Sequence, residues 1–282
     1  MGIKIVVDSA SDYSYEEAIK EGLVFMPLTV TFGNKEYRDS IDINNEEFYD
    51  MLTSSDTLPK TSQVTPYHFE KEFEKIIDNG DFVIAITISS KLSGTYSSAC
   101  IAAQRFPGKV FVVDSLNGSI GEKILTQYAL RLLETMDNPE EIVNLLNEQK
   151  EKISIFYLVD TLEYLQKGGR VSKFASMAGA FLSVKPILTF ENYEVAVAGK
   201  ARGFKKGHNL LQELIDASGK INTEMPFIIS YSGNDRTTLD KYIEKYEEIF
   251  ETDLSRIPVT KIGSTIGTHL GPNSIGIAYF NV

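Results

Sequence analysis

Four short apolar segments that alternate with helical patterns constrain the fold of this chain more than any other feature. They are Ile3–Asp12, Phe82–Ser90, Lys109–Ser115 and Ser154–Thr161. The second, FVIAITISS, is almost continuously apolar, as in strands that are covered on both faces of a sheet. Because helical patterns separate the four segments, the first half of the chain is predicted to form an α/β fold with a mostly parallel sheet flanked by helices.

This alternation ends after Thr161. The remaining sequence predicts a helix that stops at Gly168-Gly169, a β-hairpin across Glu191-Asn192, and further helices and strands. We therefore predict two domains: residues 1–158 form an α/β domain with a Rossmann-like sheet, and residues 159–282 form a smaller α+β domain. No repeat or low-complexity linker separates them, so we expect a tight interface.

Composition argues against several classes of protein. The formal net charge of −11 argues against nucleic-acid binding, since neutralising phosphates requires a basic face. The single cysteine, Cys100, and three scattered histidines provide neither a disulfide framework nor a zinc-ligand pattern, so no metal is expected. The first residues lack the regions of a signal peptide, and no apolar run reaches the ~20 residues of a membrane span. We expect a soluble, cytoplasmic protein.

Acidic or hydroxyl residues end all four apolar segments. The pairs are Asp8-Ser9, Ser89-Ser90, Asp114-Ser115 and Asp160-Thr161. In open α/β sheets ligands bind outside the carboxyl ends of the strands, so we expect the four ends to meet at one ligand-binding rim. Each pair alone is equally well explained as an N-cap of the following helix.

The stretch KLSGTYSSA follows the second apolar segment and predicts an anion site. Ser93-Gly94-Thr95 opens a helix, where backbone N–H groups and the helix dipole favour negative charge. Gly94 lacks the Cβ that would keep a ligand away from the backbone. The alternative is structural, because the small residues that follow also permit close helix–sheet packing.

Two further polar stretches contain candidate binding residues. KTSQVTP reads as a hydroxyl-rich turn in which Thr61 and Ser62 have no evident capping role. IGTHLGP places His269 in a glycine-flanked loop, where an imidazole donates to a carboxylate. A lone loop histidine is more often incidental than functional.

Basic residues stand out at two places in this acidic chain. Arg170 follows the Gly-Gly helix stop, and VAGKARGFKKG contains Lys200 and Arg202. A solvated charge run is the default interpretation, and a docking face for a phosphate or an acidic partner is the functional one. No G-x-S-x-G elbow and no phosphate-binding glycine loop is present, so the residues indicate a binding protein more than a catalyst.

Eight motifs in register resemble the DegV family along essentially the whole chain. They are IVVDSASD, KTSQVTP, ITISSKLSGTYSSA, VVDSLNGSIGEK, LVDTLEYLQKGGRVSK, LSVKPIL, GKARGFKKG and IGTHLGPNSIGIAY. The resemblance implies a long-chain fatty acid, and no cofactor, in a tunnel between the two domains. It further implies the substrate-binding subunit of a bacterial fatty acid kinase, which is not an enzyme on its own. A separate ATP-binding subunit would phosphorylate the carboxylate, and the acyl-phosphate would enter phospholipid synthesis.

The resemblance also assigns roles by position. Thr61, Ser62, Ser93 and His269 would hold the carboxylate, with further donors from Gly94 and Thr95. Arg170, Lys200 and Arg202 would face the kinase subunit or the transferring phosphate. Loading implies transient contact with a membrane surface and a mobile cover, for which residues 173–184 are the candidate, although a core helix explains that segment as well. Where the family commonly has glycine, this chain has Asn273, which tolerates left-handed backbone.

Two alternative functions remain open at this point. A phosphotransfer protein or small-anion enzyme would use His269 as the phosphate acceptor, in a head site open to solvent. A serine hydrolase would use Ser93 as nucleophile and His269 as base.

Overall fold

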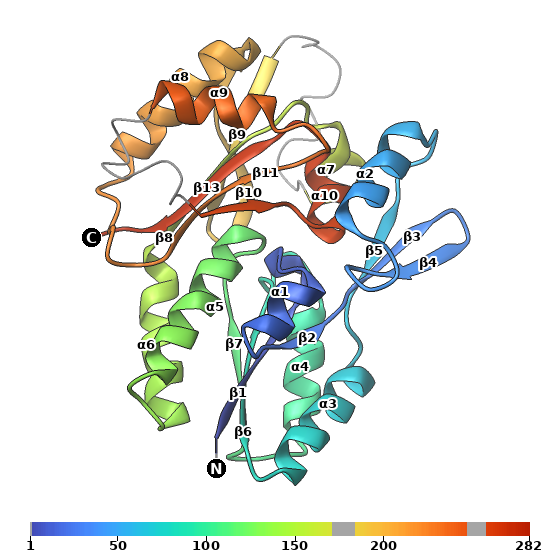
Figure 1. Cartoon of the computed structure of the whole chain (residues 1–282), viewed down its shortest axis with the longest axis vertical. Coiled ribbons are helices and arrows are strands. Elements are labelled where there is room, and N and C mark those ends of the chain that lie inside the picture. Colours follow the sequence, from blue (N-terminus) through green and yellow to red (C-terminus); the bar gives the residue numbers. More distant parts are fainter. Residues whose placement is uncertain (1, 171–183, 247–257) are drawn as a thin grey trace.

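Two main sheets lie one above the other in the computed structural model, which describes residues 2–170, 184–246 and 258–282 (Figure 1). The lower sheet is entirely parallel, with strand order β2 (Val24–Met26), β1 (Ile3–Asp8), β6 (Phe82–Thr87) and β7 (Val110–Asp114). Helices α3 (Pro66–Asp78) and α4 (Thr95–Ala103) cover one face, and α5 (Ile120–Leu133) and α6 (Pro139–Gln149) cover the other. The predicted α/β sheet flanked by helices is confirmed.

The upper sheet has six strands and is mostly antiparallel. Its order is β10 (Glu194–Arg202), β9 (Val184–Glu191), β8 (Ile153–Leu158), β13 (Ile275–Phe280), β11 (Phe227–Tyr231) and β12 (Val259–Lys261). Among its described strands, only β11 and β12 pair in parallel. Helices α8 (Gly203–Ala217) and α9 (Thr237–Lys245) cover its outer face, so its inner face is turned toward the parallel sheet and α5 (Figure 1).

The prediction that Ser154–Thr161 forms a fourth strand of the parallel sheet is wrong. This segment forms β8, which pairs antiparallel with β13 and β9, and the short strand β2 is the fourth member of the parallel sheet. Both faces of β8 are covered: Ile155 packs toward α5, whereas Phe156 packs toward α8. A strand buried on both faces is apolar throughout in either kind of sheet, so its pattern does not reveal its direction. The division of the chain at residue 158 stays a prediction; it falls at the last residue of β8, which belongs to the upper sheet.

A third, small sheet flanks the cleft between the two main sheets. It has the antiparallel order β4 (Lys35–Arg38), β3 (Thr29–Phe32) and β5 (Lys60–Ser62), with α2 (Asn45–Ser54) packed beside it. Thr61 and Ser62 therefore lie on a strand, where Thr61 pairs with Val30, and not in the predicted turn. The strand was not predicted because it is only three residues long and its hydroxyl residues are typical of turns.

Helix α10 (Ser264–Leu270) joins the small sheet to the upper sheet. It packs against α2 and against α7 (Glu163–Lys167), and it carries His269 in its last turn. The predicted glycine-flanked loop around His269 is thus wrong. Gly267 serves close packing within the helix, because a Cβ there would come within 3.0 Å of the Phe48 and Tyr49 side chains.

Local signals in the sequence explain where several helices begin. A capping box at Asn44 and Glu47 starts α2, and another at Ser14 starts α1 (Tyr15–Lys20). Asn273 adopts φ +61°, as expected for the residue that replaces the family's glycine. Among the described residues, no helix is long and apolar enough to cross a membrane. The candidate cover, residues 173–184, lies outside the described residues except for its last, which begins β9.

Candidate ligand-binding cavity

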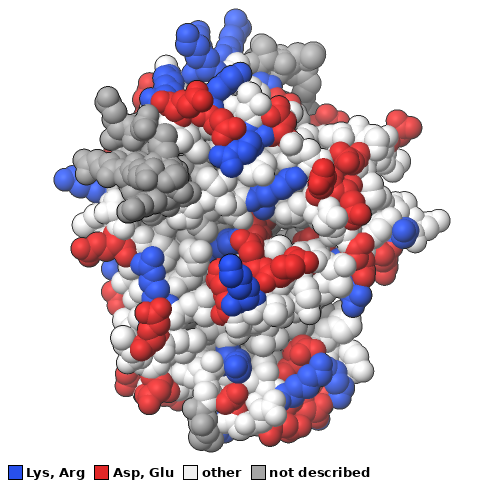
Figure 2. All heavy atoms as spheres, in the orientation of Figure 1, with Lys and Arg blue, Asp and Glu red and all other residues white. Residues whose placement is uncertain are grey.

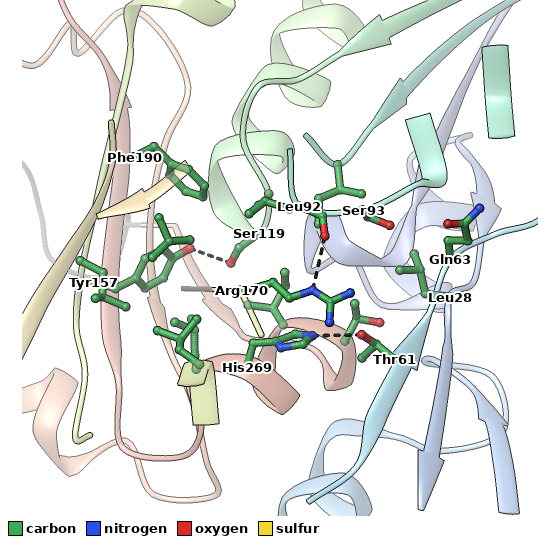
Figure 3. A pocket seen from close by; sticks show the side chains of 18 of the residues that line it. Leu28, Thr61, Gln63, Leu92, Ser93, Ser119, Tyr157, Arg170, Phe190 and His269 are labelled. Atoms are coloured by element: carbon green, nitrogen blue, oxygen red, sulfur yellow. Dashed lines mark hydrogen bonds between the residues drawn. The ribbon is translucent and has the colours of Figure 1, made fainter. Parts of the chain in front are cut away.

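A cavity of about 310 Å³ lies between the carboxyl ends of the parallel strands and the inner face of the six-stranded sheet (Figure 3). Its two ends differ in chemistry. The polar end is formed by Thr61, Ser93, Arg170 and His269, and the apolar end by Tyr157, Leu188, Phe190 and Val195. The polar end lies beside the parallel sheet and the small sheet, and the apolar end lies on β8, β9 and β10.

His269 is the central group of the polar end. Its Nε2 lies 3.0 Å from Thr61 Oγ1, which joins α10 to β5 (Figure 3). Its Nδ1 is buried without a hydrogen-bond partner. Burial lowers the pKa of His269 to about 4, and the positive charge of Arg170 adds to this shift. The imidazole is therefore neutral at pH 7, so it interacts with a ligand as a hydrogen-bonding group and not as a cation.

The turn before α4 supplies a second group of donors. Ser93 Oγ lies 2.9 Å from Thr95 Oγ1 and accepts from the Thr95 N–H at 3.2 Å. The N-cap residue of α4 is Gly94, which has no side chain to cap the helix. A Cβ at Gly94 would overlap the side chain of Gln63, which reaches across to donate to Ser98 Oγ at 2.9 Å. Gly94 thus lets the chain around Gln63 approach α4 closely.

Arg170 lies across the mouth of the polar end. Its Nη1 donates to the carbonyl of Gly168 at 2.7 Å, and its Nε lies 3.5 Å from the carbonyl of Leu92. The side chain is exposed, so its charge is available to a ligand or a partner at the opening. The sequence placed Arg170 just after the Gly-Gly helix stop, and the structure places it, exposed, in the lining of the cavity.

One polar pair interrupts the apolar wall. The hydroxyl of Tyr157 donates to Ser119 Oγ at 2.6 Å, and both residues line the cavity (Figure 3). Ser119 adopts φ +57°, an uncommon backbone for a non-glycine residue. Sequence reasoning missed Gln63, Ser119 and Tyr157. The motif VVDSLNGSIGEK contains Ser119, but no spacing rule marks it as part of a cavity wall.

Six of the nine residues singled out from the sequence line this one cavity. They are Thr61, Ser62, Ser93, Gly94, Arg170 and His269. Thr95 is buried behind them. Lys200 and Arg202 lie on β10, outside the set of lining residues, with Arg202 exposed at the strand end. The roles assigned to these residues by resemblance stay predictions.

The geometry does not favour a hydrolase. His269 pairs with Thr61 and Ser93 pairs with Thr95, and no hydrogen bond joins the two described residues Ser93 and His269. A nucleophile and its base need that contact. Within residues 2–170, 184–246 and 258–282, no group of three His, Cys, Asp or Glu side chains is placed to hold a metal ion.

The surface charge of the molecule is mixed. Figure 2 shows Lys and Arg side chains interspersed with Asp and Glu over the described part of one face, without a broad field of either sign. Among the described residues that line the cavity, Arg170 is the one that carries a positive charge.

Comparisons of sequence and of structure match this chain to the same family over essentially its whole length. The model of the DegV family, described as an uncharacterised protein family, matches residues 2–282. A DegV domain-containing protein of Caldanaerobacter subterraneus is 36% identical over 281 residues, which cover 98% of each chain. A structure described as fatty acid binding of a DegV family protein from Thermus thermophilus superposes with a TM-score of 0.88 at 29% identity, covering 100% of both chains. A stearic acid-binding protein from Eubacterium ventriosum gives a TM-score of 0.85 at 28% identity, covering 99% of this chain and 98% of that one.

Proposed function

The chain belongs to the DegV family, and we propose that it binds one long-chain fatty acid in this cavity, with the carboxylate at the polar end and the tail along the apolar end. The observation that carries the proposal is the two-ended cavity itself. Hydroxyls and a neutral imidazole lie at one end, and aliphatic and aromatic side chains lie at the other. The fatty acids bound by the similar proteins of Thermus thermophilus and Eubacterium ventriosum support it.

The polar end suits a single carboxylate. When His269 Nε2 carries the proton, it donates to Thr61 Oγ1, and the Thr61 hydroxyl is free to donate to the ligand. The Ser93 and Ser62 hydroxyls supply further donors, and Arg170 supplies one positive charge at the opening. A diphosphate would require more fixed positive charge than this site provides.

The tail supplies most of the affinity. Burying a methylene contributes roughly 0.8 kcal/mol, so about fifteen methylenes offer about 12 kcal/mol before the costs of association. The cavity volume of about 310 Å³ lies near the lower limit of ligand pockets in general, which suits a slender ligand. The bound tail would be shielded from water while the protein carries it.

We further propose that the protein presents the carboxylate to a separate ATP-dependent kinase subunit in the cytoplasm. That subunit would transfer the γ-phosphoryl group of ATP to a carboxylate oxygen and release ADP, and the acyl-phosphate would feed phospholipid synthesis. The family resemblance supports this step, as does the exposed Arg170 beside the head site. Lys200 and Arg202 are candidate contacts for that partner, and transient contact with a membrane would exchange the ligand.

Mass spectrometry of an organic extract of the purified protein tests the fatty acid proposal. We expect a near-stoichiometric long-chain fatty acid, which is lost from a double variant with Ser93→Ala and His269→Ala. An empty extract, together with failure to bind added palmitate, would overturn the proposal and favour phosphotransfer through His269.

Trapping with hydroxylamine tests the kinase step. The protein loaded with palmitate, ATP and a purified fatty acid kinase subunit should yield palmitoyl hydroxamate, and Arg170→Ala should lower the yield. A loaded protein that gives no hydroxamate with an active kinase subunit would contradict the presenting role while leaving fatty acid binding intact.

A further inference from the structure

Asp12 is a buried residue that does not line the cavity, but its side chain contacts elements that form both ends of it. It follows the short 3-10 helix Ser9–Ser11 at the carboxyl end of β1, and only 2% of its surface is exposed. Its backbone is left-handed, with φ +60°. The side chain is thus held in one place at the rim of the parallel sheet, where both oxygens have partners.

One oxygen of Asp12 reaches the helix that carries His269. The Gly263 N–H donates to Asp12 Oδ1 at 2.8 Å, and Gly263 is the residue immediately before α10. A second buried carboxylate supports the same helix, since the Thr265 N–H donates to Asp39 Oδ2 at 3.0 Å. Because α10 has only seven residues, the position of its first turn sets the position of His269 in its last.

The other oxygen of Asp12 reaches the apolar wall. The Ser119 hydroxyl donates to Asp12 Oδ2, and Ser119 Oγ accepts from the Tyr157 hydroxyl at 2.6 Å. The backbone of Ser119 is tied to the same segment, because its N–H donates to the Ala10 carbonyl at 2.6 Å. The uncommon backbone of Ser119 is therefore held by contacts on both sides.

We infer that Asp12 is a positioning residue that couples the two ends of the cavity, because its two oxygens hold the His269 helix and the Ser119–Tyr157 wall at the same time. The inference rests on the proposed fatty acid function. The side chain needs two oxygens, since an amide offers one acceptor oxygen where Asp12 uses two. Lys123 lies beside Asp12: its Nζ donates to the Asp12 backbone carbonyl at 3.2 Å and forms an ion pair with Glu17 at 3.0 Å.

A double-mutant cycle on palmitate affinity tests this coupling. In the wild-type background, each of His269→Ala and Tyr157→Phe should raise Kd by some factor. The double variant should raise Kd by a factor about fivefold smaller than the product of those two factors, because both residues belong to one connected network. In an Asp12→Asn background, the factor by which the two substitutions together raise Kd should agree with the product of their separate factors to within about twofold. Coupling that is absent from the wild type, or unchanged by Asp12→Asn, would overturn the inference.

Tyr49→Phe is the matched control. The Tyr49 hydroxyl donates to the Ile262 carbonyl at 3.1 Å, so its loss weakens the same entry to α10 without touching Ser119. A merely structural role for Asp12 predicts equal loss of coupling in both variants, whereas positioning predicts loss only in Asp12→Asn. If Asp12→Asn does not fold, Ser119→Ala removes the same branch, and persistent coupling in that variant would also overturn the inference.

A measurement without ligand separates this inference from the proposed function. In the free protein, Tyr157→Phe should shift the NMR resonances of the His269 ring, and Asp12→Asn should remove that response. A shift that persists in Asp12→Asn contradicts the coupling. Failure of the wild type to bind palmitate, with the NMR response intact, would contradict the proposed function alone.

Discussion

The two ends of the cavity differ in whether their polar groups can bind a ligand. At the polar end, the Thr61 hydroxyl that accepts from His269 can still donate, and Arg170 is exposed, so polar groups there can bind a ligand. At the apolar end, the one polar pair, Ser119 and Tyr157, is closed by its own hydrogen bonds. The difference indicates that the polar end orients a ligand, while the apolar end binds it without any specific polar contact.

This division of roles follows from the elements that build each end. Side chains of the polar end come from loops and short elements at the rim of the parallel sheet, where such folds bind ligands. Side chains of the apolar end, such as Leu188 and Phe190, stand on regular strands of the upper sheet. The interface between two sheets thus joins a polar rim to an apolar face.

Shortening the ligand tail should have the largest effect of any change. Decanoate has six fewer methylenes than palmitate, which removes about 5 kcal/mol of burial and should raise Kd by about 3,000-fold. Competition with a fluorescent fatty acid measures both constants. A ratio below about tenfold would mean that the apolar end does not hold the tail.

Protonation of His269 should destabilise the polar end at low pH. Because the folded pKa of about 4 lies below the ordinary value of 6.5, the folded state binds fewer protons than the unfolded state between these values. Stability is therefore present above pH 6.5 and is lost as the pH falls toward 4, by at most about 3 kcal/mol. Denaturant unfolding of the wild type and His269→Ala should show a difference in free energy that changes by this amount.

The opposite pH trend comes from the buried carboxyls. Burial raises the pKa of Asp8 and of Asp12 to about 7, so their contribution is present below pH 4 and lost as the pH rises through 7. The difference in unfolding free energy between the wild type and His269→Ala, taken at each pH, cancels the contribution of these carboxyls and leaves that of His269. The exposed His68 is the control, and a His68→Ala profile that changes as much as that of His269→Ala would contradict the assignment.

Filling the apolar end should discriminate between ligands by length. Val195→Phe adds bulk to the cavity wall and should weaken stearate by about 30-fold, since overpacking costs about 2 kcal/mol. Decanoate should change by less than about threefold, because a short tail does not reach that wall. Equal losses for both acids would show that Val195 does not lie beside the end of the tail.

Removing the imidazole should have the smallest effect and should not depend on tail length. His269→Ala should weaken palmitate by about tenfold, because it removes the partner that orients the Thr61 hydroxyl toward the carboxylate, and decanoate by the same factor. Methyl palmitate, which carries no charge, serves as the control ligand and should bind both proteins alike. A loss that grows with tail length would place His269 beside the tail.

Strong local patterns made three of the four strands of the parallel sheet, β1, β6 and β7, and most helices predictable. The run FVIAITISS became β6, and the capping signals of α1 and α2 lie where the structure begins those helices. The hydroxyl groups of Thr61 and Ser93 were candidates from the sequence, but only the family resemblance implied that they share a site, since Thr61 lies on β5 of the small sheet and not at the end of a parallel strand.

Other features depend on contacts that are distant in sequence. The direction of β8 is set by pairing with β13, more than 110 residues later, and its two covered faces look alike in sequence. His269 was expected in a loop because the glycines around it resemble turn residues. In the structure Gly267 lies within α10, where its lack of a side chain lets Tyr49 pack against the helix. The Ser119–Tyr157 pair joins α5 to β8 through tertiary structure alone.

The orientation of a bound fatty acid tests the central claim most directly. NMR of palmitate labelled with carbon-13 at its first, second and last carbons, bound to the wild-type protein, reports which side chains lie beside each end. The account predicts contacts from the second carbon to the Thr61 methyl group and from the terminal methyl to the Phe190 ring. Contacts of the terminal methyl with Thr61, or of the second carbon with Phe190, would contradict it.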